Sequence, residues 1–280
     1  MTYPALEKYL ARLNDTVEQD SRVWLDASGR AQGRYFNSTL TSAFQPVRLF
    51  GSAQLADASI VAHEGFARSD AQDDGGLQLW RLLDQAASDD ESVALDRLCR
   101  VLHVVNFYRQ AEQPVSLHLS VHARLLTAVD NNHGIAFRRV LNLLELPHEQ
   151  IVLQMPAVAQ KQSWLLNYVI DNYRRNGFKL ATSAIDARDA LLLLDKLRPD
   201  MVKVDARQLG SVEETERLVR QCAARGIELV FKRIEKPQVA LQLTQLSQAL
   251  GMPVQVQGFL WDTPASVLTD ENAEPLSKLA

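Results

Sequence analysis

The sequence predicts an α/β fold in which strands and helices alternate around a closed barrel that opens with an antiparallel pair of strands. From about residue 90 onward, strand-type runs alternate with helix-period segments over short connections, which favours a parallel sheet, and six such units in one domain favour closure. Upstream, the runs at 43–50 and 58–66 are separated by a polar stretch without a helix. A connection of that length suits an antiparallel pair.

Residues 1–40 form an N-terminal extension of a helix and a hairpin, residues 41–270 form the barrel, and residues 271–280 form a C-terminal tail. Apolar residues in the helix recur at the spacing of one stripe, and these are Leu6, Leu10, Leu13 and Val17. A run with two short strands around a Ser-Gly turn follows at 22–36. The stripe has two interpretations, which are packing against its own barrel and docking of a partner or a second copy in a homodimer.

Within the barrel, strand-type runs are expected at 115–120, 151–155, 178–183, 201–205, 227–231 and 254–258. Helix-period segments are expected at 93–108, 132–144, 162–175, 189–197, 212–225 and 237–250. Gly177, Gly226 and Gly251 each stand between a helix and the next strand, where a positive φ ends the helix.

Polar residues stand at the ends of the strand-type runs, where a barrel directs side chains into one common mouth. These residues are Glu64, His118, Gln154, Ser183, Lys203, Lys232 and Gln257. Two divalent cations need several anionic oxygens, and in this set only Glu64 offers one. The sequence therefore predicts neither a metal nor another cofactor.

An ion pair between Glu64 and Lys232 is one expectation, and a bridge from Lys203 to Asp205 or Glu64 is another. His118 is either a hydrogen-bonded filler or a metal ligand.

The bulk composition excludes several classes of protein. With 280 residues, 46% of them hydrophobic, the chain can bury a full core. A net charge of -4 provides no basic surface for nucleic acid and no polybasic membrane patch. Cys99 and Cys222 lie in helix-period segments and are expected to be buried, reduced thiols. The first ten residues lack the layout of a signal peptide, and no run approaches a membrane span, so a cytoplasmic location is expected.

Several short motifs share an order and spacing along most of the chain. They are Phe44-Gln45-Pro46-Val47, Glu64-Gly65-Phe66-Ala67-Arg68, Leu95-Asp96-Arg97, Lys203-Val204-Asp205 and Gln257-Gly258. Together they resemble the EAL-domain family of cyclic di-GMP phosphodiesterases over roughly residues 40–270. The resemblance implies a TIM-like (β/α)8 barrel of EAL type with an antiparallel first strand. The nucleotide contacts that it implies are Gln45, Arg68, Lys203, Glu235 and Gln257.

The departures from the family pattern fall on its metal ligands. His118 stands in place of an asparagine, Gln154 and Lys232 stand in place of glutamates, and an Asp-Asp pair becomes Ser183-Ala184. The mouth changes from net negative in the family to net positive here, and holding a divalent ion there costs several kcal/mol. The vestigial catalytic positions are Glu64, His118, Gln154, Ser183, Ala184, Lys203, Lys232 and Gln257.

Three functions compete at this stage. The favoured one is a catalytically inactive, EAL-like regulatory protein that acts by protein–protein interaction in cyclic di-GMP-linked control of motility, biofilm or transcription. The alternative is a metal-independent cyclic di-GMP receptor, in which cations of the mouth neutralise the phosphates directly. A residual phosphodiesterase is the least favoured, because a barrel without metals lacks the bound hydroxide that attacks the phosphodiester.

Overall fold

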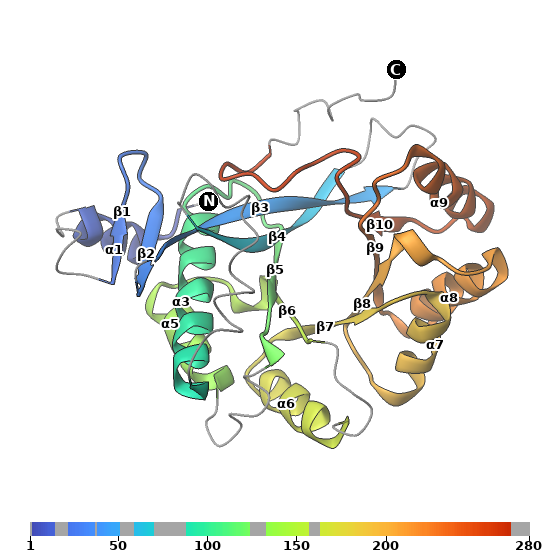
Figure 1. Ribbon diagram of the computed structural model, residues 1–280, viewed down its shortest axis with the longest axis horizontal. Helices are drawn as coiled ribbons and strands as arrows, with labels where there is room; N and C mark the ends of the chain where they lie inside the picture. The colour runs from blue at the N-terminus through green and yellow to red at the C-terminus, as the bar shows by residue number, and fades with distance from the viewer. Residues whose placement is uncertain are drawn as a thin grey trace.

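The computed structural model describes residues 2–14, 22–36, 38–50, 59–69, 88–123, 133–156 and 163–269. Within these residues eight strands close a barrel in the order β3-β10-β9-β8-β7-β6-β5-β4, and β3 also pairs with β4 (Figure 1). The strands are β3 Ser38–Phe50, β4 Ser59–Ser69, β5 Ser116–Ser120, β6 Ile151–Gln154, β7 Lys179–Ala184, β8 Met201–Asp205, β9 Glu228–Lys232 and β10 Val254–Val256. Strand β3 is antiparallel to both of its barrel neighbours, whereas the other pairs are parallel. The predicted TIM-like barrel with an antiparallel first strand is confirmed.

Helices lie outside the barrel strands (Figure 1). They are α3 Asp89–Tyr108, α5 His133–Leu143, α6 Ser163–Arg175, α7 Ala187–Lys196, α8 Val212–Arg225 and α9 Pro237–Leu250, with 3-10 turns at His148–Gln150 and Ala206–Gln208. Helix α3 begins four residues before the predicted start because the Ser88 side chain caps it by accepting a hydrogen bond from the Glu91 backbone N–H. Among the described residues, no helix combines the length and the apolar character needed to cross a bilayer.

The helix ends follow the predicted glycine pattern. Gly226 and Gly251 take φ angles of 66° and 61° at the ends of α8 and α9. Gly177, with φ 81°, leads from α6 into β7. In this left-handed region a Cβ atom is unfavourable, so glycine ends the helix at little cost.

The N-terminal extension consists of α1 Pro4–Asn14 and a hairpin of β1 Val23–Leu25 and β2 Ala31–Tyr35, on the opposite side of the barrel from α8 (Figure 1). Strand β2 pairs with the start of β3, so one sheet runs through the boundary predicted at residue 40. Leu6 and Leu13 are buried and Leu10 is partly buried against the protein's own core. The burial of Leu6 and Leu13 agrees with the first of the two interpretations, packing of the stripe on its own chain. Val17 lies outside the described residues.

The alternation of side chains along the strands sets the position of the mouth. A small apolar layer fills the barrel interior and consists of Val47, Ala62, Val152, Ala181, Met201 and Val230. Because side chains two positions apart share one face of a strand, the next interior layer toward the mouth includes Gln45, Glu64, His118, Gln154, Ser183, Lys203 and Lys232. The polar residues that end the strands thus occupy one level of the barrel.

Candidate functional site at the barrel mouth

A buried ion pair joins Glu64 and Lys203 across the barrel. The Lys203 Nζ donates to Glu64 Oε2 at 3.0 Å, and the two side chains are 0% and 9% exposed. Burial alone raises the pKa of Glu64, but the Lys203 ammonium, with smaller contributions from Gln257 and Lys232, holds the pKa below its ordinary value. The carboxylate is therefore ionised and already has a cationic partner.

A second polar chain joins Gln154, Ser183 and Lys232. The Ser183 Oγ accepts hydrogen bonds from Gln154 Nε2 at 3.1 Å and from Lys232 Nζ at 3.0 Å. Burial lowers the pKa of Lys232, Glu64 opposes this effect, and Lys203 adds to it. The expected direct pair of Glu64 with Lys232 is wrong: Lys203 is the direct partner of Glu64, and Lys232 donates to Ser183 instead.

His118 fills the barrel beside Glu64, its neighbour across the β4–β5 pair. Its side chain is fully buried, and neither ring nitrogen has a hydrogen-bond partner within the described part of the chain. Burial first, and then the positive charge of Lys203, lower its pKa well below the ordinary value. The imidazole is therefore neutral at pH 7. It is a buried filler, but the hydrogen bond expected for it is not found among the described residues.

A cavity of about 580 Å³ opens at this end of the barrel. Its lining brings together most of the residues predicted from sequence, which are Gln45, Glu64, Arg68, Gln154, Lys232, Glu235 and Gln257. Lys203 and Ser183 each form a hydrogen bond with a residue of this lining, Lys203 with Glu64 and Ser183 with Lys232. The predicted positions on separate strands and loops thus form one site, as the barrel geometry requires.

Ala184 does not belong to the mouth. Its side chain packs with Ala187, Leu191 and Val204 in the apolar layer between the barrel and its helices. It follows Ser183 directly in β7, so the strand alternation that turns Ser183 inward turns Ala184 outward. Its assignment as a vestigial site position is corrected.

The segment after β10 holds two of the predicted nucleotide contacts in place. Gln45 Nε2 donates to the Asp262 carbonyl at 2.7 Å, and Arg68 Nη2 donates to the Pro264 carbonyl at 2.9 Å. Gly258 begins this segment, and a Cβ atom there would collide with the backbone of Ile234. The glycine therefore allows the loops after β9 and β10 to pack closely at the edge of the cavity.

Sequence reasoning assigned no site role to four residues that line the cavity. Arg207 and Arg233 line it, and both donate to the Asp205 carboxylate between them. Asp96 and Arg100, a buried pair joined at 2.7 Å, line its other side. Exposed arginines just after strand ends carry no periodic signal, and Asp96 entered only as part of the Leu95-Asp96-Arg97 motif, without a role in the site. The structure places Asp96 in the second turn of α3.

A comparison with family models decides the classification. The model described as the EAL domain matches residues 30–264. The chain belongs to the EAL domain family. This family is one of cyclic di-GMP phosphodiesterases and related signalling proteins. A comparison with curated proteins gave no match.

Solved structures support the EAL fold. BlrP1 of Klebsiella pneumoniae, in a manganese and cyclic di-GMP complex, aligns with a TM-score of 0.65 and 20% identity over 82% of this chain, which spans 57% of that protein. A standalone EAL protein of Vibrio cholerae, bound to cyclic di-GMP, aligns with a TM-score of 0.63 and 16% identity over 84% of this chain and 97% of that one. The FimX EAL domain of Xanthomonas citri, also in a cyclic di-GMP complex, aligns with a TM-score of 0.62 and 15% identity. The alignment covers 82% of this chain and 90% of that one.

The donor set of this EAL domain does not fit a pair of divalent cations. Among the described residues, no group of three or more His, Cys, Asp and Glu side chains is placed to hold a metal ion. The carboxylate of Glu64 is bonded to Lys203, and the Lys232 ammonium faces the same cavity. A divalent ion in this mouth would have to displace a buried ammonium and then face a second cation.

Proposed function

We propose that this EAL domain is catalytically inactive and acts as a regulatory protein in cyclic di-GMP-linked signalling, through contact with a protein partner. The observation that carries the proposal is the inner layer as a whole, in which Gln154, Ser183 and Lys232 supply no anionic oxygen. The one carboxylate of that layer, Glu64, is paired with Lys203. Lys232, bonded to Ser183, adds a second ammonium to the same mouth.

Loss of hydrolysis follows from charge rather than from shape. Attack on a phosphodiester at neutral pH needs an activated water, which metal-dependent enzymes obtain by binding water to cations held among carboxylates. Here the inner layer of the barrel supplies ammonium, amide and hydroxyl groups with a neutral imidazole beside them, and its carboxylate, Glu64, is already paired. The imidazole of His118 is fully buried and does not line the cavity, so it is not placed to activate water there.

A hydrolysis assay tests the inactivity. Purified protein is incubated with cyclic di-GMP and either magnesium or manganese, and the linear dinucleotide product is measured. No turnover is expected, and Gln154→Glu alone is expected to restore none, because one carboxylate does not remove the charge of Lys203 and Lys232. Turnover that disappears in Glu64→Ala would overturn the proposal.

The regulatory output would then depend on binding surfaces instead of chemistry. Co-purification of the full chain from lysate, followed by direct titration with each candidate partner, tests this part. A partner that binds wild type and Gln154→Glu equally is expected, since the contact lies outside the mouth. If a fully folded protein associates with no partner while showing nucleotide turnover, the regulatory proposal is wrong.

The cavity favours a second candidate function, that of a metal-independent cyclic di-GMP receptor. A cavity of about 580 Å³ lies in the range of small-molecule sites, and Arg68 and Lys232 give its lining cations that can pair with phosphate. Calorimetric titration with cyclic di-GMP should give the same affinity with and without chelator, weakening as salt rises. Arg68→Ala and Glu235→Ala should reduce the affinity. Loss of binding on adding chelator would mean that a metal bridges the ligand.

A further inference from the structure

Two arginines converge on one carboxylate at the rim of the cavity. Arg207 binds Asp205 through Nε at 3.0 Å and Nη2 at 2.8 Å, and Arg233 binds it through Nη1 at 2.9 Å. Asp205 ends β8 opposite Lys232, which ends β9, and Arg207 and Arg233 follow these strand ends, so the three cations line the same cavity. Burial alone raises the pKa of Asp205, but the hydrogen bonds from Arg207, and then Arg233, lower it to about 2.

This arrangement leaves cationic donors for a ligand. Two guanidinium groups carry more N–H donors than a single carboxylate can accept. Both arginine side chains line the cavity and are about half exposed, at 51% and 55%. One carboxylate balances one of the two positive charges, and Lys232 adds another beside them. The opposing carboxylate on this rim belongs to Glu235, which is exposed.

The backbone at Arg233 is unusual for an arginine. Its φ angle is 63°, in the left-handed region that favours glycine. A non-glycine residue persists there only when the surrounding structure holds it, and such positions cluster at functional sites. The Asp205 contact and the packing of Gly258 on the neighbouring Ile234 supply that constraint. Asp205 thus orders both guanidinium groups before any ligand arrives.

We propose that Arg207 and Arg233, positioned by Asp205, form an anion subsite that binds a phosphodiester group of a cyclic dinucleotide in the mouth cavity. The proposal rests on the receptor function described above and adds residues that the family resemblance did not assign. In this subsite, guanidinium groups neutralise the phosphate charge, which bound metal ions neutralise in metal-dependent enzymes. Planar guanidinium groups match two phosphate oxygens at once, so they also fix the orientation of the ligand.

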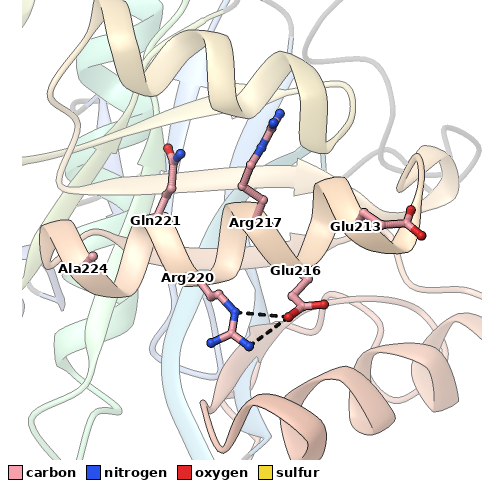
Figure 2. A pocket seen from close by; sticks show the side chains of 6 residues that line it. All are labelled: Glu213, Glu216, Arg217, Arg220, Gln221 and Ala224. Carbon is pink, nitrogen blue, oxygen red and sulfur yellow. Dashed lines mark hydrogen bonds and ion pairs between the residues drawn. The ribbon is translucent and has the colours of Figure 1, made fainter.

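A second group of charges shows what an ordinary surface cluster looks like in this molecule. On the outer face of α8, a shallow groove is lined by Glu213, Glu216, Arg217 and Arg220, and Glu216 binds Arg220 (Figure 2). Its acids and bases balance, and it lies outside the barrel. Because its acids and bases are equal in number, it provides a control for charge removal.

The test compares two variants by calorimetry in chelator. Arg207→Ala/Arg233→Gly removes the subsite, and Arg220→Ala removes a cation that is 55% exposed and ion-paired, as Arg233 is. Cyclic di-GMP should bind the double variant about ten-fold or more weakly than wild type, as the loss of charge-assisted contacts predicts. Arg220→Ala should change the affinity by less than about two-fold. Thermal melting verifies folding. If the double variant unfolds, Arg207→Lys/Arg233→Lys replaces it: lysine keeps the charge but lacks the planar fork, so cyclic di-GMP should still bind more weakly than to wild type, and an unchanged affinity would refute the subsite.

Inorganic pyrophosphate as a second probe separates the subsite from the receptor function. If pyrophosphate binds wild type but not the double variant, and cyclic di-GMP does not bind wild type, Arg207 and Arg233 form an anion site, but its assignment to a cyclic dinucleotide and the receptor proposal are both refuted. If cyclic di-GMP binds wild type and the double variant equally, the receptor proposal stands and the subsite is refuted. If neither probe binds wild type, both are refuted.

Discussion

The pairing of Glu64 with Lys203 makes a prediction about stability that separates this mouth from a metal site. At 3.0 Å and an effective dielectric constant of about 20, the gross attraction is about 5 kcal/mol. Glu64→Gln removes it and leaves the ammonium of a fully buried lysine uncompensated. Removing one partner of a buried pair costs about 3–5 kcal/mol, and we expect a loss of that size in the free energy of unfolding.

Urea unfolding at neutral pH, followed by circular dichroism, measures this loss. Glu216→Gln is the matched control, since Glu216 pairs with Arg220 on the exposed face of α8 and should cost less than about 0.5 kcal/mol. Adding Lys203→Met to Glu64→Gln should recover much of the stability, because the unpaired charge is then gone.

The opposite result is equally clear. In a carboxylate cluster built for metals, the ligands repel one another when the ions are removed, so neutralising one of them stabilises the protein. If Glu64→Gln is as stable as wild type or more stable in chelator, then Glu64 is not held as the partner of Lys203. The charge argument for an inactive mouth would fail with it.

Three further results are expected. Gly258→Ala should destabilise the protein by about 2 kcal/mol or more in urea unfolding, because its Cβ collides with the Ile234 backbone; an unchanged midpoint would contradict the close packing. Arg233→Gly should be about 1 kcal/mol more stable than Arg233→Ala, since both lose the Asp205 contact but only glycine relaxes the left-handed backbone. The stability lost in Asp205→Asn should be full above pH 3.8 and shrink as the pH falls toward about 2, because the folded-state pKa of Asp205 is depressed; a pH-independent difference would refute this.

The barrel and the residues at its strand ends could be predicted because both depend on regular patterns. Strand-type runs that end on a polar residue identify Glu64, Gln154, Lys203 and Lys232, and the side-chain period of two places them on one level. The same period explains the error at Ala184, where a motif match overrode the alternation. Position along a strand identifies the face better than similarity to a motif does.

The partners within the site could not be predicted in the same way. Sequence does not reveal which of two lysines reaches Glu64, because both lie on the same level and the choice depends on the geometry across the barrel. Arg207 and Arg233 gave no signal, since loop residues follow no period and a left-handed φ is not visible in an arginine. The apolar stripe of α1 predicts that one face of the helix is covered, but it does not identify the covering surface. For Leu6, that surface is the protein's own core.

The closure of the barrel also has a consequence for synthesis on the ribosome. Strand β3 pairs with β10, and Arg48 of β3 forms a buried ion pair with Asp262, 214 positions later in the chain. At roughly 5–20 residues per second, β3 waits roughly 10–40 s for these partners to be translated. During that interval its β10-facing edge is open to other strands. Nascent chains of this protein should therefore depend on chaperones late in translation more than a fold with neighbouring strand partners does.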